Sequence, residues 1–88
     1  MIIIFSSSFK KRLPRLMPKI KKAFEKRLEL FMIDQRNPLL NTHKLSGKYE
    51  HCYSINVTGD YRAIFEWRER EDLVTFTEIG RHHELYGK

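Results

Sequence analysis

The sequence of 88 residues has little cysteine, glycine and proline, and it contains no long apolar run. Its single cysteine, Cys52, cannot form a disulfide within the chain, and there is no CxxC pair to bind zinc or exchange electrons. The apolar run at residues 1–5 is far shorter than the roughly 20 residues that span a bilayer. Basic residues follow this run instead of preceding it as they do in a signal peptide. We therefore expect a cytoplasmic protein that does not bind a membrane.

Common cofactor and metal motifs are also missing from the sequence. It has no GxGxxG segment, no Walker lysine loop, no HExxH pair and no internal repeat. A zinc site built from histidines and Cys52 is disfavoured, because neighbours such as His51 and Cys52 point to opposite faces of a strand. We predict no cofactor and no bound metal. The length predicts one domain over residues 1–88.

Positive charge is unevenly distributed along the chain. Lys and Arg number 17 against 11 Asp and Glu, a net charge of +6, and residues 1–28 hold nine of the basic residues against Glu25 alone. Such a block is typical of a protein that binds a polyanion, because phosphate contacts release condensed counterions. The alternative is a solvated helix face that only keeps the protein soluble. The candidate polyanion contacts in this block are Lys19, Lys21 and Lys22.

The first part of the chain predicts a strand and two antiparallel helices. Residues 1–5 form a β-branched run, and the three serines that follow offer hydroxyls to cap a helix. Pro14 should end this helix near Leu13, and Pro18 suits the first turn of the second helix. The second helix should end near residues 34–35, before Pro38. Its apolar stripe, which indicates packing on a sheet, contains Ile20, Phe24, Leu28 and Phe31.

The later part predicts a loop that carries His43 and then three strands, at residues 49–57, 61–67 and 73–79. These segments are rich in β-branched and aromatic residues, and polar turns between them favour antiparallel hairpins. Gly80 should end the last strand, before a short turn or single helical turn at the carboxyl end.

The predicted order β-α-α-β-β-β gives an α+β fold with helices on one face of a small antiparallel sheet. Alternation leaves open which face of the strand at 61–67 meets the helices, because Ile64 shares a side with Arg62 and Glu66. Polar residues in and beside strands indicate where function lies; they are Ser54, Asn56, Asp60, Arg62 and Glu78.

Three short motifs in this order resemble the RelE/ParE toxin superfamily, and most of all its YafQ-like branch. The motifs are His43-Lys44-Leu45-Ser46-Gly47, the pair Asp60-Tyr61 at the start of a strand, and Gly80-Arg81-His82-His83-Glu84-Leu85-Tyr86. Each motif is weak alone, but together they are fairly specific. The helical segment of residues 9–40 also looks like the family's helical hairpin, so the resemblance covers nearly the whole chain.

The resemblance implies the toxin of a type II toxin–antitoxin system, a ribosome-dependent mRNA endoribonuclease. Its partners would be the ribosome, mRNA and a cognate antitoxin with an acidic neutralising segment, in a toxin–antitoxin hetero-oligomer. Metal-free cleavage by the ribose 2′-hydroxyl needs a base, an acid for the leaving oxygen and cations for the phosphorane charge.

The resemblance also implies candidate catalytic residues. His82 matches the terminal histidine and His43 the upstream one; an imidazole can donate or accept a proton near neutrality. Asp60 would orient or accept a proton, and Arg62 would bind phosphate. Tyr86 matches the terminal aromatic residue. The structural alternatives are a surface histidine for His82, loop capping for His43, a hairpin aspartate for Asp60, an ion pair of Arg62 with Glu78 or Glu66, and a packing anchor for Tyr86.

The candidate RNA-binding residues are Tyr61, which would stack on a base, with Asn56, Arg81, Lys19, Lys21 and Lys22.

Two residues depart from the family pattern. Asn56 stands where the YafQ-like pattern has a histidine, and an amide cannot shuttle a proton. Glu78 stands where an arginine is expected, and its carboxylate repels phosphate. These departures keep three alternatives open: a weakened toxin that acts only by binding, a ParE-like gyrase inhibitor, and a non-toxic RNA-binding domain.

Overall fold

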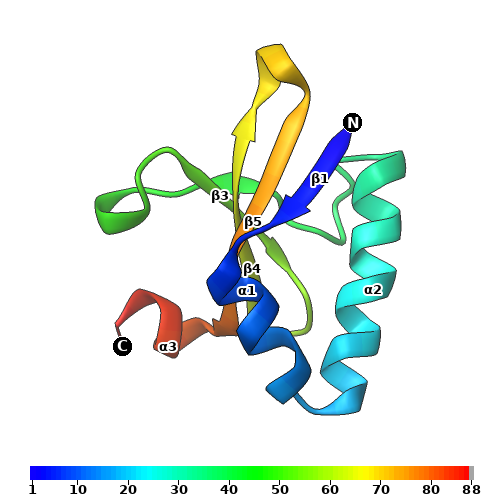
Figure 1. Ribbon diagram of the computed structural model, residues 1–88, viewed down its shortest axis with the longest axis vertical. Coiled ribbons are helices and arrows are strands. Elements are labelled where there is room, and N and C mark those ends of the chain that lie inside the picture. Colours follow the sequence, from blue (N-terminus) through cyan, green and yellow to red (C-terminus); the bar gives the residue numbers. More distant parts are fainter. Residues whose placement is uncertain (88) are drawn as a thin grey trace.

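The computed structural model describes residues 1–87 and has an α+β fold, as predicted (Figure 1). The helices are α1 (Ser7–Arg12), α2 (Pro18–Ile33) and α3 (His82–Tyr86). The strands are β1 (Ile2–Phe5), β2 (His43–Lys44), β3 (Cys52–Asn56), β4 (Tyr61–Arg68) and β5 (Leu73–Arg81). No helix of residues 1–87 is both long enough and apolar enough to cross a bilayer.

The two predicted helices form where their capping residues indicate. The Ser6 hydroxyl accepts a hydrogen bond from the Phe9 backbone N–H at 3.2 Å, which caps α1. A 3₁₀ turn, Leu13–Arg15, contains Pro14 and lets the chain double back. Pro18 then occupies the first position of α2. Figure 1 shows α1 and α2 running in opposite directions.

The five strands form one sheet in the order β1-β5-β4-β3-β2. Strands β3, β4 and β5 pair as antiparallel hairpins, as predicted, whereas β1 lies parallel to β5 at the edge. The loop predicted around His43 is wrong in part, because His43 and Lys44 form a short edge strand that pairs with β3. This segment is polar and has little strand propensity, so the sequence did not predict a strand. The free edge of β3 nevertheless supplies backbone hydrogen bonds to it.

Two predicted strand ends are wrong. The strand predicted from residue 49 begins at Cys52, because Gly47–Tyr49 form a 3₁₀ turn and His51 has a φ of +77°. Strand β5 continues past Gly80 to Arg81, whose partner is Tyr61. Gly80 instead allows a close approach, since a Cβ there would lie 3.2 Å from Glu84 Oε1.

An irregularity in the pairing of β4 with β5 settles which face meets the helices. The register shifts between Ile64 and Phe65, so Phe76 and Ile79 both face the helices although they are three residues apart. Phe65 lies on this side and Ile64 on the other.

Aromatic side chains form the core between α2 and the sheet. Phe31 lies 5.0 Å from Phe65 between ring centroids, and Phe24 lies 5.4 Å from Phe76. Burying each such ring contributes roughly 1.5–3 kcal/mol. The predicted stripe is confirmed in Ile20, Phe24 and Phe31, which are buried, and in Leu28, which packs against the core while half-buried. Helices α1 and α2 therefore occupy one face of the sheet and leave the other for different side chains.

Candidate functional site

The face of the sheet that points away from α2 carries most of the polar strand residues. Directly paired residues of antiparallel strands project to the same side. One row runs His43, Ser54, Ile64 and Glu78, and the next runs Asn56, Arg62 and Gly80. We call this surface the polar sheet face; its polar residues are His43, Ser54, Asn56, Arg62 and Glu78.

Aromatic residues from two segments border the polar sheet face. Tyr49, from the 3₁₀ turn, and Tyr86, from α3, meet edge to face with ring centroids 5.9 Å apart. His82, four residues earlier on the same helix, meets Tyr86 edge to face with ring centroids 4.6 Å apart. Partial burial, and then the nearby Glu78 carboxylate, raise the pKa of Tyr49. These contacts bring α3 to the side of the sheet that holds Glu78.

The His43 ring has a defined orientation. Its Nδ1 lies 2.8 Å from the Asn41 carbonyl oxygen, which can only accept, so Nδ1 carries the proton. Nε2 of the neutral ring is then an acceptor, and it lies 3.5 Å from the buried Ser54 hydroxyl. The Asn41 contact agrees with the loop-capping role considered for His43, and it also makes Nε2, beside the Ser54 hydroxyl, the acceptor of the ring.

Two buried polar atoms beside this surface have no hydrogen-bond partner within residues 1–87. They are Asn56 Oδ1 on β3 and the Tyr86 hydroxyl on α3. Buried polar groups are normally paired, and exceptions concentrate at functional sites. Asn56 stands directly across from Arg62.

The Arg62 guanidinium does not point freely into the polar sheet face. Its Nη1 donates to the backbone carbonyls of Thr58, Gly59 and Tyr61 at 3.1, 3.2 and 3.1 Å. Neither Glu78 nor Glu66 forms an ion pair with it in the part of the chain that the structure describes. Arg62 thus fastens the β3–β4 turn, a role that sequence reasoning missed.

Asp60, Tyr61 and Arg81 lie apart from the polar sheet face. Tyr61 and Arg81 are paired on the side of the helices, and the guanidinium carbon lies 5.7 Å from the centre of the Tyr61 ring. Arg81 Nε donates to the Tyr61 hydroxyl at 3.3 Å, which raises the pKa of Arg81, and lies 3.7 Å from Asp60 Oδ2. One backbone hydrogen bond joins the two regions, from His82 N–H to the Asp60 carbonyl at 2.9 Å.

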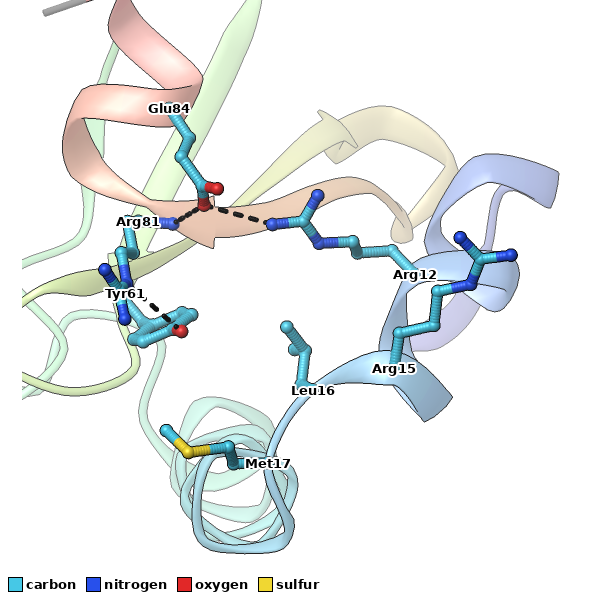
Figure 2. Close-up of a pocket in the computed structure, with 7 residues that line it drawn as sticks. All are labelled: Arg12, Arg15, Leu16, Met17, Tyr61, Arg81 and Glu84. Carbon is cyan, nitrogen blue, oxygen red and sulfur yellow. Dashed lines mark hydrogen bonds and ion pairs between the residues drawn. The ribbon is translucent and has the colours of Figure 1, made fainter.

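Tyr61 and Arg81 border a cleft of about 380 Å³ on the helix side, between α1, the start of α2 and the end of β5 (Figure 2). We call it the arginine cleft, and its lining is Arg12, Arg15, Leu16, Met17, Tyr61, Arg81 and Glu84. Arg12 Nη2 lies 3.0 Å from Glu84 Oε1, and the Arg81 N–H donates to the same oxygen at 2.8 Å. Three of the seven lining residues are therefore cationic and one is anionic.

The three candidate lysines lie elsewhere again. Lys19, Lys21 and Lys22 line a shallow hollow with Pro18 and Glu25 on α2. Because α2 covers the opposite side of the sheet, the lysines do not join the polar sheet face. The predicted site residues thus divide among three surfaces.

Sequence reasoning missed two residues at the border of the polar sheet face, Lys48 and Tyr49, whereas Ser54 was among the polar strand residues that it singled out. Ser54 is fully buried beside His43, and Lys48 Nζ lies 5.2 Å from the centre of the Tyr49 ring. The available signal was Gly47-Lys48-Tyr49 directly after the His43 loop. The strand propensity of Tyr49 assigned this residue to the following strand instead. Within residues 1–87, no three His, Cys, Asp or Glu side chains are grouped so that they could hold a metal ion.

Toxins of known structure share this architecture. YafQ from E. coli strain BL21(DE3) superimposes with a TM-score of 0.75 at 21% identity, over 97% of both chains. A YoeB/ParE toxin from Agrobacterium tumefaciens gives 0.73 at 10% identity, over 93% of this chain and 99% of that chain. A chain of the archaeal RelE–RelB complex from Pyrococcus horikoshii OT3 gives 0.73 at 16% identity, over 91% and 92%.

No protein-family model and no curated protein sequence matches the chain. The predicted resemblance is confirmed at the level of structure: the chain has the RelE/ParE toxin fold, and YafQ is among its structural neighbours.

Proposed function

We propose that this chain, with its RelE/ParE toxin fold, is the toxin of a type II toxin–antitoxin system and cleaves mRNA on the ribosome. The observation that carries the proposal is the fixed orientation of His43, whose Nε2 acceptor lies on the same side of the sheet as Asn56 and Glu78. His82 and Tyr86 border this side through α3.

The polar sheet face offers a base for strand cleavage. In the proposed step, His43 Nε2 takes the proton of a ribose 2′-hydroxyl while that oxygen attacks the adjacent phosphorus. The P–O5′ bond breaks and a 2′,3′-cyclic phosphate forms. The hydrogen bond from Nδ1–H to Asn41 supports this role, because it holds the ring in the tautomer that leaves Nε2 bare.

His82 is the proposed acid that gives a proton to the departing 5′-oxygen. It is exposed at the start of α3, and its backbone is fastened to Asp60. Tyr86 packs edge to face on the His82 ring, and its buried hydroxyl has no partner in residues 1–87. Lys48, at the border beside Tyr49, is a candidate to offset phosphorane charge.

A second candidate, a weakened toxin that acts by binding, is favoured by two observations. The Arg62 guanidinium is occupied by three carbonyls of its own turn, and Glu78 adds negative charge to the face where phosphate would lie. Both features reduce stabilisation of the transition state without changing the fold.

The proposed partners are the ribosome, mRNA and an antitoxin. The complexes of RelE with RelB from P. horikoshii and of YoeB with YefM from Staphylococcus aureus are structural neighbours of this chain. A net charge of +6 favours an antitoxin whose neutralising segment is acidic and orders on binding, in a toxin–antitoxin hetero-oligomer.

Primer extension on a defined message in a translating extract tests the function. Wild-type protein is compared with His82→Ala and with His83→Ala, the neighbouring exposed histidine, as the matched control. We expect cuts at A-site codons with wild type and His83→Ala, and none with His82→Ala. Absence of cuts with the wild type would favour the weakened toxin, and a gyrase supercoiling assay would then test ParE-like inhibition.

A further inference from the structure

We propose that the arginine cleft is a second RNA-binding site, which holds phosphodiester backbone and stacks a base on Tyr61. This proposal rests on the proposed function only because it assumes that the polyanion bound by the protein is RNA. The cleft lies on the helix side of the sheet, so it would bind a stretch of RNA other than the one on the polar sheet face.

The charges of the cleft favour an anionic ligand. Arg12 forms an ion pair with Glu84, and Arg81 forms one with Asp60. These ion pairs fix the directions of the two guanidiniums. Arg15 has no acidic partner within residues 1–87, and it is exposed beside Arg12 (Figure 2). A guanidinium presents a planar fork of donors that matches phosphate oxygens. One arginine is therefore free for the ligand beside two that are held in place.

The start of α2 adds to this charge. Met17 is the N-cap residue and supplies no side-chain acceptor, and no acidic residue lies in the first turn. The positive end of the 16-residue helix therefore lies at the border of the cleft without an acidic residue in its first turn. The helix end supports the arginines and is not itself the site.

The shape favours an extended ligand with repeated anions. A second hollow, of about 230 Å³, adjoins the arginine cleft and is lined by Ser8, Lys11, Arg12 and Arg15. The two hollows share Arg12 and Arg15, so four basic residues line two adjacent hollows. A single small anion would use one hollow, whereas a phosphodiester chain can follow both.

The apolar part of the cleft favours nucleic acid over an acidic peptide. Figure 2 shows the Tyr61 ring, Leu16 and Met17 pointing into the space between the arginines. Met17 is 52% exposed, so its thioether is open to a ligand from this side, and the half-buried Tyr61 ring carries the Arg81 guanidinium over it. Sites for single-stranded RNA combine a cationic groove with an aromatic platform on which bases stack. A peptide carboxylate has no comparable use for the ring.

The sheet separates this site from the polar sheet face. The pair Tyr61 and Arg81 projects toward the helices, and the neighbouring pair Arg62 and Gly80 projects the other way. One nucleotide cannot contact both surfaces, so loss of the cleft should weaken binding and leave the chemistry intact.

Fluorescence anisotropy with a labelled, unstructured RNA tests the proposal on the full chain. Arg15→Gln is compared with Arg70→Gln, an arginine in the β4–β5 turn at the far end of the molecule (Figure 1). Both variants lose one charge. We expect Arg15→Gln to weaken RNA binding about fivefold or more and to lower the slope of log K against log salt by about 0.7–1. Arg70→Gln should change neither quantity.

Two results would overturn the proposal. Equal weakening by both variants would mean that RNA responds only to net charge. Binding of polyglutamate that depends on Arg15, with RNA binding that does not, would assign the cleft to an acidic peptide. Ribosomal cleavage by wild type, run in parallel, separates the two hypotheses: a protein that does not cleave, yet binds RNA through Arg15, would contradict only the proposed function.

Discussion

The two faces of the sheet differ in what their side chains are used for. On the helix side, Phe65 and Phe76 are fully buried and pack against rings from α2. On the other side, His43 turns its Nε2 acceptor to the Ser54 hydroxyl, and Asn56 has a buried oxygen without a partner in residues 1–87. One packed face is enough to hold this small sheet together, which leaves the other face for groups that would be costly in a core.

The helix side should carry the stability. Phe76→Ala removes a ring that contacts Phe5, Phe9, Phe24, Phe31 and Phe65, and it should lower the free energy of unfolding by about 3–5 kcal/mol. Urea denaturation measures this loss. The control is Ile33→Ala, at a residue that is 83% exposed and should change stability by less than about 0.5 kcal/mol. Equal losses would place the core elsewhere.

The polar sheet face should carry the chemistry. His43→Gln should lower the rate of mRNA cleavage by about 10²- to 10⁴-fold, because the amide cannot take a proton, and the unfolding curve should hardly move. Quenched-flow cleavage on programmed ribosomes measures the rate. His51→Gln, at an exposed histidine near Glu50, is the control and should retain the wild-type rate. A fully active His43→Gln protein would remove His43 from the catalytic set.

Substitution of Arg62 tests whether its side chain stabilises the fold or binds phosphate. Arg62→Gln removes three hydrogen bonds to the β3–β4 turn, and it should cost about 1–2 kcal/mol of stability, discounted for solvent exposure. Thermal unfolding measures this cost. If Arg62 instead binds phosphate in the transition state, cleavage will fall steeply while stability stays as in the wild type.

The smallest effect should come from Glu84, which joins α3 to α1. The backbone N–H of Arg81, and then the charge of Arg12, lower the pKa of Glu84. A lowered pKa means that the carboxylate stabilises the fold above the ordinary pKa of about 4.3, and that this contribution is lost as the pH falls through the lowered value.

Glu84→Gln should therefore destabilise the protein by a few tenths of a kcal/mol at pH 7. The difference from wild type should disappear in strongly acidic buffer, as measured by urea denaturation at several pH values. A difference that persists there would assign the effect to packing instead of charge.

Local patterns were sufficient to predict the α+β class, the two main helices and the three antiparallel strands of the hairpins. Pro14 and Pro18 mark the break between the helices, and the stripe of Ile20, Phe24 and Phe31 marks the face that packs. Parallel pairing of β1 with β5 was not predictable from local patterns, because it joins segments about 70 residues apart in sequence.

The site was predictable only in part, because spacing along one strand does not reveal where a long side chain ends. Arg62 lies on the expected strand, but its guanidinium turns back to the backbone. Tyr61 and Arg81 were predicted to bind RNA together with Asn56, yet alternation sends them to the opposite side of the sheet. The register shift after Ile64 had no signal in composition.

In this account, one side of the sheet carries the chemistry and the other side binds RNA. The most direct test of this division is the cleavage rate as a function of toxin concentration, measured on programmed ribosomes for His43→Gln and Arg15→Gln. We predict that His43→Gln lowers the maximal rate without changing the half-saturating concentration. Arg15→Gln should raise the half-saturating concentration and keep the maximal rate. If both substitutions changed the same parameter, the assignment of chemistry to one side of the sheet and of RNA binding to the other would be wrong.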